Sequence, residues 1–182
     1  TAPAVARDVV GDIWVYWGTG DRLEPLARKD YKDGFFAVRD LGKSVPLTSG
    51  NLQNISGATQ QFTELSAKDG WYILLGGKGE KVLANPTVFG GVAYFTTYTP
   101  DSGGGDPCEQ AGTAKLYGIS YIDGAGSFTG GERSMYLGKG ISSAPLISAG
   151  AEAGKGGMFG WLSGGSSASG TPWKGAPTLK WP

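Results

Sequence analysis

The chain has 182 residues, and its 16 basic and 16 acidic side chains cancel, so it shows no electrostatic footprint for nucleic acid or an anionic membrane. No segment approaches the roughly 20 consecutive apolar residues that a membrane-spanning helix needs. Histidine is absent and cysteine occurs once, which removes most of the usual zinc, iron and nucleophile–base sites. We therefore expect no nucleic-acid partner, no membrane span and no cofactor.

Glycine and proline indicate the fold class. The chain contains 33 glycines and 10 prolines and has no long stretch of helical periodicity, which is typical of many short strands joined by turns. Aromatic residues make up 12% of the chain, and spaced valines, isoleucines and leucines accompany them. Such a composition argues against low-complexity disorder and predicts an all-β protein.

One sequence pattern occurs three times. Each copy consists of a small residue, a proline, a short apolar strand, a glycine turn and an aromatic strand, and the copies begin at Pro3, Pro86 and Pro145. A constant unit at irregular spacing predicts sheets of one kind that carry loops of variable length. We expect Pro86 and Pro145 to stand at equivalent strand starts, where a missing N–H is tolerated.

The strands follow from short apolar runs bounded by glycine or charged residues. We expect them at 3–7, 12–17, 35–40, 71–75, 85–89, 92–98, 115–122, 134–137, 144–147, 158–163 and 177–181. Residues 41–68 form a polar insertion with two apolar anchors, Leu52 and Phe62. The first eight strands make two units of four, and a third unit begins at Ala144.

Four-stranded antiparallel units in series are typical of the blades of a β-propeller. The chain supplies about two and a half blade-like units, at about 1–83, 84–142 and 143–182, within a single β domain covering 1–182. A propeller needs at least about four blades to close, so we expect this part to be incomplete on its own. A self-contained β-sandwich is the alternative, although it does not explain the threefold pattern.

Long ordered segments resemble a known family. They are GDIWVYWGTGD at 11–21, FFAVRD at 35–40, GEKVLANPTVFGGVAYFTTYTP at 79–100, DPC at 106–108, GTAKLYG at 112–118 and LGKGISSAP at 137–145. Together they resemble the end of the C-terminal propeller of PilY-type proteins, which are type IV pilus biogenesis factors and tip-associated adhesins. The similarity extends from about residue 3 to residue 147.

This resemblance implies a non-enzymatic, pilus-associated protein that acts in pilus biogenesis, tip assembly and surface adhesion. It implies an extracellular or outer-surface location, reached by an export signal not present in this chain, and pilins or minor pilins as partners. Some family members carry a calcium loop of alternating acidic residues. No Asp-x-Asp-x-Asn run occurs here, so calcium control is not carried over.

Two other classes of protein remain as alternatives. A structural subunit of an extracellular filament or complex would complete its sheets with strands from neighbours. A fragment of a quinoprotein-type propeller dehydrogenase would also be rich in glycine and tryptophan, but it would need a complete ring, catalytic acidic residues and usually calcium.

Three sets of residues suggest sites. Asp101, Asp106 and Glu109 share a glycine-rich loop that could bind a hard cation, although turn-forming carboxylates are the preferred interpretation. Gly18-Thr19-Gly20 suggests a phosphate cradle but lacks the rest of the glycine fingerprint, so a strand-ending turn is favoured. A carbohydrate platform is suggested by seven aromatic residues, about half of which strand alternation assigns to the core: Trp14, Tyr16, Trp17, Tyr94, Phe95, Phe159 and Trp161.

The single cysteine is the remaining candidate. Cys108 lies in the polar segment Asp-Pro-Cys-Glu, between glycines, where a thiol would be accessible. In an oxidising setting a lone cysteine is usually paired outside the visible chain or is a free thiol. Because incomplete blades leave sheet edges unpaired, we predict that an upstream propeller segment or a second polypeptide packs against the chain, with Cys108 as the candidate for interaction or a disulfide.

Overall fold

The computed structural model describes residues 1–27, 30–101, 111–148, 157–163 and 171–174. Within these ranges the protein is all-β, as predicted. The helices of the described part are single 3-10 turns: η1 (Ser49–Asn51), η2 (Glu64–Ser66) and η3 (Thr129–Gly131). No helix among the described residues is long and apolar enough to cross a membrane.

The first sheet, sheet 1, is an antiparallel meander with one added edge strand. Its order is β1-β2-β3-β5-β4, and β4 pairs with β5 in parallel. The strands are β1 (Ala4–Arg7), β2 (Ile13–Gly18), β3 (Gly34–Asp40), β4 (Gln53–Asn54) and β5 (Gly70–Leu74). β4 and the two turns beside it belong to the expected polar insertion, whose anchors Leu52 and Phe62 are buried as predicted.

Sheet 2 repeats the meander, and sheet 3 contains its first part. In sheet 2, β7 (Thr87–Phe89), β8 (Val92–Thr99), β9 (Thr113–Ser120) and β10 (Ser134–Lys139) pair in sequence order, and β6 (Lys81–Val82) pairs with the far end of β8. In sheet 3, β11 (Leu146–Ser148), β12 (Gly157–Leu162) and β13 (Thr171–Lys174) are antiparallel. Sheets 1 and 2 thus each contain an antiparallel meander of four strands, as predicted, together with one added short strand.

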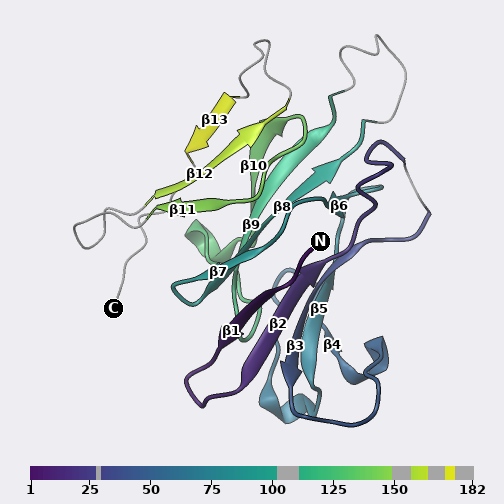
Figure 1. Ribbon diagram of the computed structural model, residues 1–182, viewed down its shortest axis with the longest axis vertical. Helices are drawn as coiled ribbons and strands as arrows, with labels where there is room; N and C mark the ends of the chain where they lie inside the picture. The colour runs from purple at the N-terminus through teal and green to yellow at the C-terminus, as the bar shows by residue number, and fades with distance from the viewer. Residues whose placement is uncertain (28–29, 102–110, 149–156, 164–170, 175–182) are drawn as a thin grey trace.

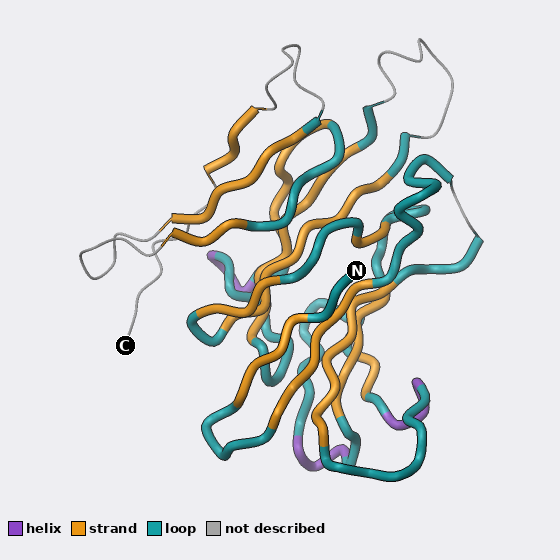
Figure 2. The backbone as a smooth tube through the Cα atoms, viewed as in Figure 1, coloured by secondary structure: helices purple, strands orange, loops and turns teal. Residues whose placement is uncertain are grey.

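The sheets are stacked in sequence order and do not close into a barrel (Figures 1 and 2). One core cluster joins sheet 1 to sheet 2, where Phe35 and Phe95 stack with ring centroids 3.9 Å apart. A second cluster joins sheet 2 to sheet 3 through Leu116, Met158 and Leu162. A two-sheet sandwich does not have a middle sheet covered on both faces, so the blade prediction describes the arrangement and the sandwich alternative does not.

The proline prediction is confirmed. Pro3, Pro86 and Pro145 each stand directly before a strand, β1, β7 or β11, that forms a hairpin with the next strand of its sheet. Hydrogen bonds join neighbouring starts, since the Ala2 N–H donates to Asn85 Oδ1 at 3.0 Å and the Thr87 hydroxyl donates to the Pro145 carbonyl at 3.3 Å. The three strands that follow these prolines therefore lie side by side along one edge of the stack.

Sequence analysis missed three short strands. β4 and β6 have two residues each, too few to show a period, and β13 follows a Ser/Gly-rich segment. The expected strand at 177–181 lies outside the described residues. β6 pairs with sheet 2, although its residues precede the expected boundary between 83 and 84. The division into three blade-like units stays a prediction.

Candidate functional site

The most informative surface is the side of sheet 1 that faces away from sheet 2, which we call the outer face. Strand alternation directs Trp14 and Tyr16 into the core between sheets 1 and 2 and turns their neighbours outward. The outward residues in the middle of the sheet are apolar: Val5, Val15, Trp17, Phe36, Val38 and Tyr72. Polar outward residues lie at its margins: Arg7, Asp40 and Asn54. A sheet that meets water on one face normally alternates apolar and polar residues, and the middle of sheet 1 does not.

Aromatic rings form a continuous row across this face. Trp17 lies opposite Phe36 in the β2–β3 register, and Phe36 lies opposite Tyr72 in the β3–β5 register. Their rings stack at centroid distances of 5.4 and 5.7 Å with interplanar angles of 11° and 19°. All three side chains are half-buried. The row is rigid, apolar and accessible, properties that favour contact with another protein surface.

A second row on the outer face is made of valines. Val5 pairs with Val15, and Val15 pairs with Val38, while Val5 keeps 62% of its surface exposed. The segment after β3 passes beside this row and encloses a hollow of about 220 Å³ with Leu41 and Leu47 in its lining. At its rim the Lys43 ammonium contacts the buried Asp69 carboxylate at 2.6 Å.

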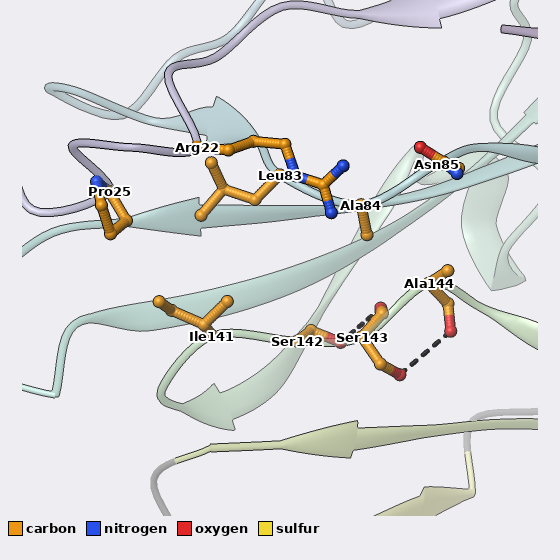
Figure 3. Close-up of a pocket in the computed structure, with 9 residues that line it drawn as sticks. All are labelled: Arg22, Pro25, Leu83, Ala84, Asn85, Ile141, Ser142, Ser143 and Ala144. Atoms are coloured by element: carbon orange, nitrogen blue, oxygen red, sulfur yellow. Dashed lines mark hydrogen bonds between the residues drawn. The ribbon is translucent and has the colours of Figure 1, made fainter. Parts of the chain in front are cut away.

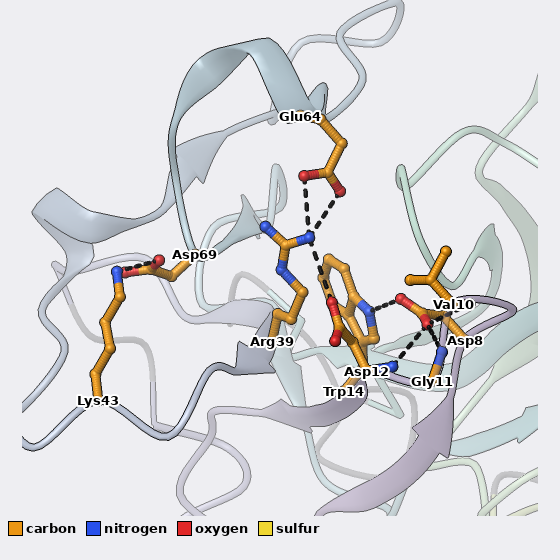
Figure 4. Close-up of polar contacts among 9 residues, drawn as sticks. All are labelled: Asp8, Val10, Gly11, Asp12, Trp14, Arg39, Lys43, Glu64 and Asp69. Carbon is orange, nitrogen blue, oxygen red and sulfur yellow. Dashed lines mark hydrogen bonds and ion pairs between the residues drawn. The ribbon is translucent and has the colours of Figure 1, made fainter.

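Charged residues hold in place the end of sheet 1 at which β2 begins and β3 ends (Figure 4). Arg39 Nη1 donates to both oxygens of Glu64 at 3.0 Å and lies 3.6 Å from Asp12 Oδ2. The Arg39 guanidinium also lies over the ring of Trp14, 5.8 Å from its centroid. These contacts are a cation–π pair and ion pairs around a buried tryptophan, and they fix the position of β3 relative to β2.

Asp8 organises the hairpin between β1 and β2 (Figure 4). Its Oδ1 accepts the N–H groups of Val10, Gly11 and Asp12, and its Oδ2 accepts the Trp14 indole N–H at 3.0 Å. The indole hydrogen bond is the main cause that lowers the pKa of the Asp8 carboxyl, and the backbone donors add to it. The tip presents Val9 and Val10, which are 92% and 78% exposed.

A hollow of about 310 Å³ lies beside the strand starts (Figure 3). It is lined by Arg22, Pro25, Leu83, Ala84, Asn85 and residues 141–144. Its serine hydroxyls are engaged, because Ser142 donates to the Ser143 carbonyl and Ser143 donates to the Ala144 carbonyl and accepts the Trp161 N–H. The hollow therefore offers mainly apolar walls and the exposed Arg22.

The buried titratable groups are used by the fold. Glu80 accepts from the Thr97 hydroxyl at 2.7 Å, the Tyr117 hydroxyl at 3.1 Å and the Gly77 N–H at 2.7 Å, and the Lys115 ammonium lies 3.5 Å away. Burial, and secondarily the Glu80 charge, raises the pKa of the Tyr117 hydroxyl. These contacts tie the turn before β6 to β8 and β9.

Arg133 connects sheet 2 to the insertion of sheet 1. It donates to the carbonyls of Gly124 at 2.8 Å, Ile55 at 2.6 Å and Gly57 at 2.9 Å, and to that of Gln60. Burial lowers the pKa of the Arg133 guanidinium, while the Asp123 charge opposes the shift. The preceding loop is held from sheet 1 as well, by hydrogen bonds to its successive carbonyls 121–123 from Tyr16 OH, Trp71 Nε1 and Phe62 N.

Sequence-predicted sites fall into three groups. Cys108, Asp106 and Glu109 lie outside the described residues, so the proposed thiol contact and cation loop stay predictions; Asp101 is exposed at the end of β8. In the described ranges no cluster of three or more metal-ligating His, Cys, Asp or Glu side chains occurs. The Gly18-Thr19-Gly20 segment ends β2, as the turn interpretation predicted.

The strand-ending glycine also has a packing role. A Cβ on Gly18 would lie 2.4 Å from Val82 Cβ, so β6 crosses the end of β2 only because the side chain is absent. The Val82 N–H donates to the Thr19 carbonyl at 2.9 Å. This segment therefore joins sheet 1 to sheet 2.

The aromatic set divides between core and surface. Trp14, Tyr16, Tyr94 and Phe95 are buried, which confirms the core interpretation for them. Trp17 belongs to the outer face, and Trp161 of β12 is 55% exposed. The side chain of Phe159 lies outside the described set. Sequence analysis did not single out the outer face, although both alternating sets of residues in β2 are apolar, which indicates a strand with two apolar faces.

Comparisons with known proteins give a likeness of fold. No family model and no curated protein matches the chain. Among solved structures it is similar to the C-terminal domain of Pseudomonas aeruginosa PilY1, with a TM-score of 0.55 and 17% sequence identity over 90% of this chain. The chain spans 43% of the length of that solved chain. At this identity the likeness concerns the fold, which is an open stack of propeller-like antiparallel sheets.

Proposed function

We propose that this chain is the blade-bearing part of a non-enzymatic, type IV pilus-associated protein that acts in pilus biogenesis, tip assembly and surface adhesion. The observation that carries the proposal is the stack of sheets, which resembles the fold of the PilY1 C-terminal domain over 90% of the chain. In each sheet an equivalent proline precedes the first hairpin of the meander. The ordered segments that resemble PilY-type proteins support it independently of the fold.

An extracellular or outer-surface location forms part of the proposal. Pilins or minor pilins would be its partners, and the valine tip of the first hairpin, formed by Val9 and Val10, offers exposed apolar contact surface. Contiguous exposed apolar side chains of this kind often mark a site where another protein binds.

A binding role is preferred to catalysis because the buried ionisable groups are committed to structural contacts. The oxygens of Glu80 accept hydrogen bonds from three neighbouring groups, and Asp69 is paired with Lys43. A quinoprotein dehydrogenase would need acidic residues directed into an open cavity. Absorbance titration of the native protein with pyrroloquinoline quinone and Ca²⁺, followed by a dye-reduction assay, tests this alternative directly.

The pilus role is tested by deleting the coding region in the source organism. We expect fewer surface pili by electron microscopy, reduced pilus-dependent motility and weaker surface attachment, all restored by the wild-type gene. Immunogold labelling should place the protein on sheared pili or the outer surface. Normal pilus number, motility and attachment in the deletion strain would contradict the proposal.

A further inference from the structure

The registers of the three sheets make their positions comparable. Directly after its proline, β1 pairs Ala4 with Tyr16, and β7 pairs Thr87 with Tyr94. Trp17 of sheet 1 therefore corresponds to Phe95 of sheet 2, and Val15 corresponds to Ala93. In sheet 3, Leu146 pairs with Phe159, so Met158 is the counterpart of Ala93.

Equivalent positions face the preceding sheet in both interfaces of the stack. Ala93 and Phe95 lie in the core cluster shared with sheet 1, and Met158 lies in the cluster shared with sheet 2. Val15 and Trp17, the counterparts in sheet 1, point to the outer face. The outer face of sheet 1 is therefore equivalent to the face of sheet 2 that packs against sheet 1 and to the face of sheet 3 that packs against sheet 2.

The sheet 1–sheet 2 interface shows what fills such a face. Phe95 stacks on its cross-strand neighbour Tyr117 at 4.7 Å, and Phe35 of sheet 1 lies against Phe95 with ring planes 5° apart. On the outer face the corresponding stack is Trp17 on Phe36. On the outer face, no described residue takes the position against the Trp17–Phe36 stack that Phe35 takes against Phe95. At the sheet 2–sheet 3 interface the residue corresponding to Phe35 is Leu116, which also lies in the core cluster.

We propose that the outer face is covered by a further antiparallel β-sheet of the same kind, which directs a bulky apolar side chain onto the Trp17–Phe36 stack. Each sheet of the stack packs against the next one in sequence, so this sheet is assigned to the segment preceding Thr1 in the same polypeptide. The 43% coverage of the PilY1 chain leaves room for such a segment in a protein of that fold.

The covering sheet would place its first strand beside β1. Neighbouring strand starts are already joined by hydrogen bonds, from Ala2 to Asn85 and from Thr87 to Pro145. Asn85 and Ala144 lie beside the same hollow (Figure 3). The blade arrangement underlies this proposal, whereas the pilus role does not, because the sheets stack wherever the protein acts.

Hydroxyl-radical footprinting of the native protein, isolated from its source, tests the assignment against the 182-residue chain produced alone. We expect an intact mass larger than that of the chain, and oxidation of Trp17, Phe36 and Tyr72 reduced several-fold in the native protein. Tyr136, which is 61% exposed on β10, is the internal control and should oxidise equally in both samples.

Three outcomes overturn the proposal. They are a native mass equal to that of this chain, equal oxidation of Trp17 in both samples, and a stable dimer of the isolated chain in which Trp17 is protected. The last result would assign the face to a second copy. Protection of Trp17 in a protein whose deletion leaves pili unchanged would reject the pilus role and keep the covering sheet.

A charge placed on the face gives an independent measurement. Trp17→Glu in the native protein should lower the thermal midpoint much more than it does in the isolated chain, because only the native protein would bury the charge. Leu65→Glu, at a position that is 96% exposed on η2, is the matched control and should have the same small effect in both. Equal effects of Trp17→Glu in the two proteins would overturn the proposal.

Discussion

Sheets 1 and 2 share a four-stranded antiparallel meander that begins after a proline, but they differ in what covers them. β8 of sheet 2 is buried along nearly its whole length because its alternate residues enter two different core clusters. β2 of sheet 1 is equally apolar, yet only Trp14, Tyr16 and Gly18 are buried. Apolar residues at both parities thus mark a sheet built for two neighbours, and in sheet 1 only one neighbour lies in the described structure.

The strongest way to sharpen this comparison is to truncate the two equivalent aromatic residues in the isolated chain. Phe95→Ala should lower the free energy of unfolding by about 3–5 kcal/mol, the usual cost of emptying a packed aromatic site. Trp17→Ala should cost about 1 kcal/mol, because its ring is half exposed. Urea denaturation measures both. Equal losses would mean that the outer face is as well packed as the sheet 1–sheet 2 core.

The connection between the two sheets is tested at Arg133. Arg133→Met removes the donor of four carbonyl contacts and should lower the free energy of unfolding by about 3 kcal/mol, because buried carbonyls lose their partners. Hydrogen exchange should accelerate in the insertion around Ile55. Lys68→Met is the control, since it removes one exposed hydrogen bond, to the Gly50 carbonyl, and should cost about 1 kcal/mol. Indistinguishable effects would remove Arg133 as the connecting residue.

The crossing of β6 over β2 is tested by adding one methyl group. Gly18→Ala places a Cβ against Val82 and should cost about 1–3 kcal/mol through overpacking. Gly76→Ala is the matched control, because nothing lies within 4 Å of its added Cβ. Thermal unfolding of both variants should separate them, and a neutral Gly18→Ala would show that the sheets adjust without loss.

The smallest effect is expected at the hairpin tip of sheet 1. The folded state lowers the pKa of Asp8, so its contribution to stability is present above the unfolded value of about 3.9 and is lost as the pH falls through the lower folded value. The difference in unfolding free energy between wild type and Asp8→Ala should therefore shrink from pH 6 towards pH 2. A difference in unfolding free energy that stays constant over this range would show that the ionised Asp8 carboxylate does not stabilise the hairpin.

Much of the fold could be predicted from residue patterns. Alternation and glycine turns located the long strands to within about two residues, and the three prolines identified equivalent strand starts. These features are local, because proline lacks an N–H and glycine permits turns wherever they occur. The burial of Leu52 and Phe62 within a polar insertion followed from the same local contrast of apolar and polar residues.

The candidate site depended on tertiary structure. Trp14 and Trp17 are close in sequence and chemically alike, and only the position of sheet 2 decides that one is buried and the other belongs to the outer face. Nothing local predicts that Arg133 binds carbonyls 73 to 78 residues earlier in the chain, or that Val82 meets Gly18. The sequence by itself determined which segments form strands and that their faces are apolar. Packing between sheets decided which of these apolar faces is buried, because burial depends on neighbours that come from distant parts of the chain.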